Sequence, residues 1–138
     1  MEIAVQLEPG QASNDGRVAR DPRIARALAA ISARVADRWT VAKLAKIAGL
    51  SRAAFARRFA AEVGQPPARY VASLRLQRAA DLLSSDDASL AEIAAAVGYA
   101  TEFALSRAFR RSVGEPPGAF RKRIRARSAP FTPRCLAA

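Results

Sequence analysis

Arginine is the residue through which this chain is best equipped to do chemistry. The 138 residues include 20 arginines among 23 cations, against 12 acids, which gives a net charge of +11. The planar guanidinium matches phosphate oxygens and the edge of guanine. A chain this short and this basic is expected to meet a polyanion, either nucleic acid or an anionic membrane surface.

The composition excludes several kinds of site. There is no histidine, and the one cysteine, Cys135, lies close to the end, so neither a metal cluster nor an internal disulfide is expected. No apolar run approaches the roughly 18 residues of a membrane span. The first 16 residues carry three acids and no cation, unlike a secretory signal. We therefore expect a cytoplasmic protein that is not an enzyme and uses no cofactor.

The apolar spacing predicts an all-α fold. Helices are expected where an N-cap residue, an apolar stripe and a terminating glycine follow one another. Residues 1–20 and 128–138 show no sustained period and are expected to be a flexible lead-in and a flexible tail. The predicted helices cover residues 22 to near 39, 41–48, 52–63, 67–83, 90–97, 102–113 and 117 to about 127.

The second half of the helical region repeats the first. After a match of 44–49 with 93–98, eight positions agree at an offset of 50: Phe55, Arg57, Phe59, Val63, Gly64, Pro66, Pro67 and Tyr70 with Leu105, Arg107, Phe109, Val113, Gly114, Pro116, Pro117 and Phe120. The unit is a short helix, a glycine turn and a second helix, which is the plan of a helix-turn-helix. A bundle repeated only for packing is the alternative. The prediction is about seven helices in two helix-turn-helix subdomains, 21–65 and 85–127, joined by a long helix over 66–84.

Arg57 and Arg107 occupy equivalent outward positions on the second helix of each motif. At 100° per residue, Arg57 lies about 200° from Phe55 on the helical wheel. A packing repeat would keep its aromatic residues, glycines and prolines, but it has no need of an exposed arginine. Each guanidinium suits bidentate pairing with guanine, worth about 1–3 kcal/mol of base discrimination. Taken alone, each arginine could equally be a solvated surface residue.

Two residues near Arg107 have two interpretations each. Phe103 lies opposite the core stripe of its helix, so it either packs on a neighbouring helix, which base rates favour, or contacts a thymine methyl. Glu102 either complements the helix dipole, the interpretation we favour, or accepts a hydrogen bond from cytosine.

Phosphate contacts are expected from further cations and from the amides at capped helix starts. Any one of these residues alone is more simply read as solvated surface. The set comprises Thr40, Ser51, Arg52, Arg58, Thr101, Arg110, Arg111 and Arg121, with the rest of the C-terminal run, Lys122, Arg123, Arg125 and Arg127.

These same residues carry a family resemblance. The stretch Gly98-Tyr99 … Leu105-Ser106-Arg107-Ala108-Phe109-Arg110-Arg111 … Gly114-Glu115-Pro116-Pro117 … Phe120-Arg121 is similar to the signature of AraC/XylS-type bacterial transcription regulators. Residues 40–70 resemble the first motif of that family, and the whole resemblance covers about 21–125. It implies two recognition helices that enter successive major grooves on one face of DNA. The base contacts it implies are Ala53, Ala56, Arg57, Glu102, Phe103, Ser106 and Arg107.

The chain departs from the family pattern in three ways. Family members commonly carry a sensor or dimerisation domain, which residues 1–20 are too few to form, so we expect a monomer that is a DNA-binding unit alone, a truncated product or a fragment. Ala53 and Ala56 are small for an outer face, so the first motif is expected to read few bases. Leu105 stands where the family usually has phenylalanine.

Sequence-specific binding to double-stranded DNA, with activation of transcription through RNA polymerase, is the leading hypothesis. The alternative is a protein-interaction module or anti-activator that kept the fold but lost base reading, which the small outer residues of the first motif favour. A membrane-surface helix is a third reading, but 120–127 is too short for it.

Overall fold

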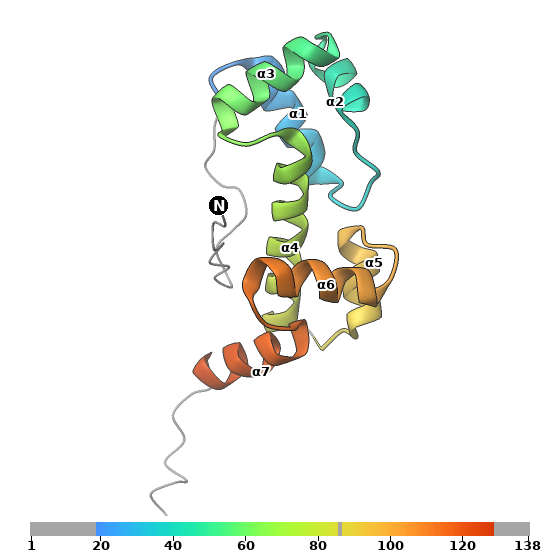
Figure 1. Cartoon of the computed structure of the whole chain (residues 1–138), viewed down its shortest axis with the longest axis vertical. Coiled ribbons are helices and arrows are strands. Elements are labelled where there is room, and N and C mark those ends of the chain that lie inside the picture. Colours follow the sequence, from blue (N-terminus) through green and yellow to red (C-terminus); the bar gives the residue numbers. More distant parts are fainter. Residues whose placement is uncertain (1–18, 86, 129–138) are drawn as a thin grey trace, which may run out of the picture.

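The computed structural model describes residues 19–85 and 87–128, and this part of the chain is all-helical (Figure 1). The predicted fold class is therefore confirmed. The expected lead-in and tail lie almost wholly outside the described residues. The helices are α1 (Pro22–Ala33), α2 (Val41–Ala48), α3 (Arg52–Val63), α4 (Pro67–Ser85), α5 (Leu90–Val97), α6 (Glu102–Val113) and α7 (Pro117–Ser128).

The helices begin and end at the residues that the sequence marks for this purpose. The side chains of Asp21, Thr40, Ser51, Ser89 and Thr101 each accept a hydrogen bond from an amide in the first turn of the following helix. Gly49, Gly64, Gly98 and Gly114 close α2, α3, α5 and α6 with φ between 74° and 103°. That left-handed backbone is readily adopted only by glycine.

One predicted boundary is wrong. The first helix was expected to run to near Trp39, but α1 ends at Ala33. Val35 stays buried from the loop after α1, with 7% of its surface exposed, so the apolar spacing continues beyond the helix itself. The Trp39 indole donates a hydrogen bond to the Arg34 carbonyl at 2.9 Å, which stabilises the turn that replaces the helix.

Two separate apolar clusters form the core, and α4 contributes to both. Val71 and Leu74 pack with α1, α2 and α3, whereas the later residues of α4 pack with α5, α6 and α7. The repeat is visible in the packing. The rings of Phe59 and Tyr70 meet edge to face at 5.7 Å, and those of their counterparts Phe109 and Phe120 meet edge to face at 5.2 Å.

α4 runs along the long axis of the molecule and separates the two motifs (Figure 1). We call α1–α3 the first subdomain and α5–α7 the second. α3 and α6 lie on the same side of α4 and cross it in the same direction, from right to left in Figure 1. This arrangement brings the second helix of each motif to one face of the molecule.

Asp21 ties the start of α1 to the C-terminal half of α3. Its carboxylate, 8% exposed, caps α1 and forms ion pairs with Arg23 at 3.0 Å and with Arg58 at 3.3 Å. Its own amide donates to the Glu62 carboxylate at 3.0 Å. Hydrogen bonds from Arg23, together with the positive charges of Arg23 and Arg58, lower the pKa of Asp21 to about 2.

We expect Asp21 to make the stability of the chain depend on acid pH. In the unfolded chain the pKa of this carboxyl returns to about 3.8. The lowered pKa therefore stabilises the fold fully above about pH 4, and this contribution is lost as the pH falls toward 2. Asp21→Asn should remove it, so urea unfolding of parent and variant should differ more at pH 5 than at about pH 2.5.

Asp87→Asn provides a matched control. Asp87 also pairs with an arginine, Arg125, at 2.8 Å, but its side chain is 92% exposed. Solvent screening should make the effect of this substitution small. Unfolding free energies of the Asp21→Asn variant that run parallel to the parent across this pH range would contradict the prediction.

Candidate nucleic-acid interface

The outer face of α3 presents small residues around one free arginine. Phe55 and Phe59 are fully buried on the opposite side of the helix. Ala53 and Arg57 are exposed, and Ala56 is half-buried. The Arg57 guanidinium has no hydrogen bond or ion pair with another described residue. The backbone of α3 can therefore approach a flat or grooved surface closely, with one long donor projecting from it.

The outer face of α6 is built differently around the equivalent arginine. Arg107 is exposed and, within the described part of the chain, unpaired. Glu102 and Ser106 beside it are half-buried. Glu102 lies in the first turn of α6, a position that suits the dipole interpretation, and its role toward a base stays a prediction.

Phe103 does not pack on a neighbouring helix, so the interpretation that we favoured from the sequence is wrong. Its exposed fraction is 71%, and among the described residues it is the one large apolar side chain that is exposed. Its helix turns it away from the core that Leu105 and Phe109 enter. An exposed phenyl ring beside a free guanidinium is a surface prepared for a partner with both apolar and polar groups.

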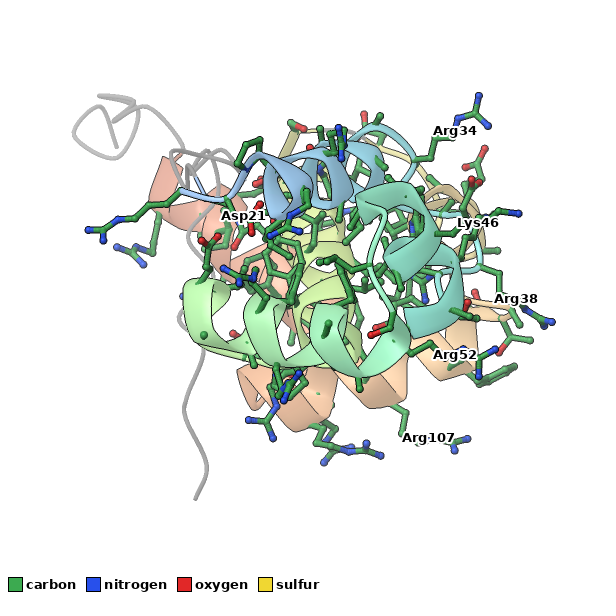
Figure 2. The ribbon with its side chains drawn as sticks, turned by 90° about the horizontal axis from the view of Figure 1, so that it is seen from above. Asp21, Arg34, Arg38, Lys46, Arg52 and Arg107 are labelled. Carbon is green, nitrogen blue, oxygen red and sulfur yellow. The ribbon has the colours of Figure 1, made fainter. Side chains whose placement is uncertain are left out.

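The two outer faces point the same way. Figure 2, a view along the long axis, shows α3 and α6 crossing the same side of the molecule, with Arg107 projecting from that side. Neither Arg57 nor Arg107 enters the core, as the outward positions predicted for them from the sequence require.

The residues predicted to contact phosphate divide into two groups: those that are unpaired or cap the start of a helix, and those whose guanidinium groups have partners inside the fold. Arg52, Arg110 and Arg111 are exposed and without a partner among the described residues. The hydroxyls of Thr40, Ser51 and Thr101 cap the starts of α2, α3 and α6. They accept hydrogen bonds from the backbone amides of Lys43, Ala54 and Ala104, respectively.

Arg58 and Arg121 belong to the second group, because their guanidinium groups have internal partners. Arg58 pairs with Asp21 at 3.3 Å. Arg121 donates to the carbonyl of Leu83 at 3.0 Å and to that of Ala88 at 2.8 Å, which ties α7 to the last turn of α4 and to the loop before α5. These contacts give both arginines a structural role that the sequence did not indicate.

The basic run in α7 is also partly neutralised within the fold. Arg123 pairs with Glu115 at 2.8 Å, and Arg125 pairs with Asp87 at 2.8 Å. Lys122 and Arg127 remain exposed. The positive charge available to a partner therefore lies more on α3, α6 and their surroundings than on α7.

Sequence reasoning missed a row of cations beside the start of α3. Arg34 and Arg38 lie in the segment that follows α1, Lys46 lies on α2, and the side chains of all three are exposed and unpaired among the described residues. Figure 2 shows them along one side of the molecule together with Arg52, and we call these four residues the basic edge. The predicted first helix includes Arg34 and Arg38, so it does not place them beside the start of α3.

Other kinds of site find little support in the described residues. Within 19–85 and 87–128, no three His, Cys, Asp or Glu side chains come close enough together to hold a metal ion. None of the helices in these ranges has the length and apolar character needed to cross a membrane.

Comparison with known proteins matches residues 44–123, from within α2 to within α7, to the model of a helix-turn-helix domain family. A putative AraC-like transcription regulator of Streptomyces lividans is 48% identical over 102 residues, which cover 74% of this chain. The chain belongs to the AraC/XylS-type helix-turn-helix family. The predicted family resemblance is confirmed, and the chain is a DNA-binding domain of this type.

Two further known proteins are similar to the chain. One is the DNA-binding domain of AdpA, the global transcriptional factor, whose crystal structure was solved in complex with a target DNA. Its sequence is 32% identical to that of this chain, and the two structures match with a TM-score of 0.74 over 79% of this chain and 98% of that one. RclR, an RCS-specific transcriptional activator of Escherichia coli, is 44% identical over 87 residues, 63% of this chain and 31% of its own length. The chain spans about a third of the length of the curated relatives it matches.

The two groups of arginines should behave differently on substitution. Arg121→Ala removes charge-assisted hydrogen bonds to two carbonyls and should lower the free energy of unfolding by about 1.5–3 kcal/mol. Arg111→Ala, a change at an exposed and unpaired arginine on the neighbouring α6, should leave stability within about 0.5 kcal/mol of the parent.

Urea unfolding measures the stability difference, and the salt dependence of DNA binding separates the two roles. Arg111→Ala should reduce the slope of log affinity against log salt by about 1. An Arg121→Ala variant with parental stability and a reduced salt slope would return Arg121 to the phosphate contacts predicted from the sequence.

Proposed function

We propose that the chain binds duplex DNA in a sequence-specific manner, with α3 and α6 in successive major grooves on one face of the double helix. Two observations carry the proposal: α3 and α6 cross the same side of the molecule (Figure 2), and each helix presents an exposed, unpaired arginine, Arg57 or Arg107, away from its buried apolar residues. The 19 residues of α4 give it a length of about 28 Å at 1.5 Å per residue. That length suits two motifs set about one DNA turn, 34–36 Å, apart.

Each outer face would read bases by a different chemistry. Arg57 and Arg107 would each pair with guanine through two hydrogen bonds, and Phe103 would pack against a thymine methyl. Glu102 and Ser106 would add polar contacts to neighbouring bases. Ala53 and Ala56 would chiefly let the backbone of α3 come close to the bases.

Phosphate contacts would hold this arrangement on the duplex. Arg52 lies at the start of α3, Arg110 and Arg111 lie in α6, and the other members of the basic edge extend the positive surface past the start of α3. The amides at the starts of α2, α3 and α6, which Thr40, Ser51 and Thr101 cap, would add neutral donors at helix N-termini. The proposed units remain the subdomains 21–65 and 85–127 and the joining segment 66–84.

Regulation of transcription is the biological role that follows from this binding. We assign activation, through contact with RNA polymerase, because one relative similar to this chain is named a transcriptional activator. We assign the described unit as a monomer that needs no cofactor and acts at the nucleoid in the cytoplasm.

A protein-interaction or anti-activator role remains the alternative, and one observation favours it. The outer face of α3 offers only methyl groups around Arg57, so this helix could bind DNA without distinguishing its sequence. Purely electrostatic binding depends on salt but has nearly the same affinity for all duplexes.

Selection of bound duplexes from a random pool tests the two roles. We expect a recovered site with two short conserved parts separated by about one helical turn. The selected duplex should bind at least about 10³-fold more tightly than a scrambled one at about 150 mM salt. Equal affinity for selected and scrambled duplexes would overturn sequence-specific reading and support the alternative.

Arg107→Ala should weaken binding to the selected site by about 1–3 kcal/mol and relax the preference at one base position. Arg110→Ala is the matched control on the same helix, since it removes another exposed cation that we assign to phosphate. The control should weaken binding to all sequences alike. Repeating the selection with each variant measures both effects, and an Arg107→Ala variant with unchanged base preferences would remove Arg107 from the reading set.

A further inference from the structure

A polar junction lies between the two apolar cores, and Arg75 of α4 is at its centre. Along α4, Leu74 belongs to the first core and Leu76 to the second, so Arg75 stands where one core ends and the other begins. Its Nε donates to the Val35 carbonyl at 3.1 Å, and a terminal nitrogen donates to the Asp37 carbonyl at 2.7 Å. Both carbonyls belong to the loop between α1 and α2.

The second subdomain closes the same junction through Gly98, at the turn between α5 and α6. A Cβ atom built on Gly98 would lie 2.9 Å from the Arg75 Nε and 3.0 Å from the Ala36 Cα. Such distances leave no room for a side chain. The guanidinium is therefore held between a loop of the first subdomain and a turn of the second. Figure 1 shows this loop descending beside α4 toward α5.

The first subdomain has few other broad attachments to α4. α5 and α7 pack extensively on α4, whereas the contact between α3 and α4 is narrow. Arg78 adds a second polar link by donating to the carbonyl and hydroxyl of Ser32, at 3.0 and 3.2 Å. The rotational position of the first subdomain about the axis of α4 therefore depends heavily on polar contacts. Arg78 makes them with the end of α1, and Arg75 makes them with the loop between α1 and α2.

We propose that Arg75 determines which operator spacing the chain accepts, because it fixes the rotational phase between α3 and α6. The proposal rests on the function proposed above. One extra base pair between two half-sites moves the second by about 3.4 Å and turns it by about 34° around the DNA axis. A rigid junction cannot follow such a change without losing contacts in one groove, whereas a loosened junction can.

The binding experiment uses the full chain and the duplex it selects from a random pool. One base pair is inserted or removed between the two half-sites, and each protein's affinity loss is expressed relative to its own affinity for the unaltered duplex. The parent should lose about tenfold or more. For Arg75→Met, which keeps the aliphatic stem but removes the donors, the loss should shrink at least about threefold, with Arg75→Lys between the two.

Arg26→Met is the matched control, because Arg26 donates to the Ala48 carbonyl at 3.4 Å entirely within the first subdomain. It should keep the parental spacing penalty. Since each loss is a ratio within one protein, a general decrease in affinity or stability cancels. A parental penalty in the Arg75→Met variant would overturn the proposal, and a parent that binds every duplex alike would instead overturn the proposed function.

A measurement without DNA tests whether Arg75 makes the junction rigid, even if the parent binds every duplex alike. Spin labels at Ala61→Cys on α3 and Arg111→Cys on α6, in a Cys135→Ser background, report the distance between the two helices. Arg75→Met should broaden the distance distribution clearly, and Arg26→Met should not. A distribution as narrow as that of the parent would overturn the role of Arg75.

Discussion

The roll of each recognition helix about its own axis is the constraint on which the outer surface depends. Phe59 in α3 and Phe109 in α6 are fully buried, and each meets the ring of Tyr70 or Phe120 from the following helix edge to face. Because an aromatic pair of this kind has a preferred geometry, it fixes orientation as well as burying area. With that side of the helix anchored, the residue two positions before each phenylalanine, Arg57 or Arg107, has to point outward.

The arginines serve two purposes, and the net charge alone does not separate them. Several guanidinium groups are held by partners within the fold. Those that join parts of the chain distant in sequence are Arg26, Arg58, Arg75, Arg78, Arg121 and Arg125, whereas Arg23 and Arg123 pair with nearby carboxylates. A guanidinium held by a carboxylate or by carbonyls releases few counterions when DNA arrives. The electrostatic attraction to DNA therefore depends chiefly on the recognition helices and the basic edge.

The sequence contained most of the fold because its local signals agree with the tertiary packing. Caps, terminating glycines and apolar stripes located the helices, and the repeat located both recognition helices and the outward arginines. The errors arise where tertiary packing, and not the local pattern, decides burial or partner. Val35 is buried from a loop, so its spacing imitated a continuing helix. The partners of Arg58 and Arg121 lie more than 30 residues away, two of them main-chain carbonyls that leave no trace in side-chain pattern.

The difference between the two outer faces makes the junction important for specificity. α6 combines a phenyl ring, a hydroxyl and a guanidinium, whereas α3 has a single guanidinium among alanines. One arginine can recognise guanine wherever guanine occurs, so by itself it distinguishes few sites. Its reading becomes informative only if its distance and angle from α6 are fixed. A guanidinium clamped between a loop and a turn at Arg75 supplies that restraint, so the sparse first motif gains specificity from the rigidity of its connection to the second.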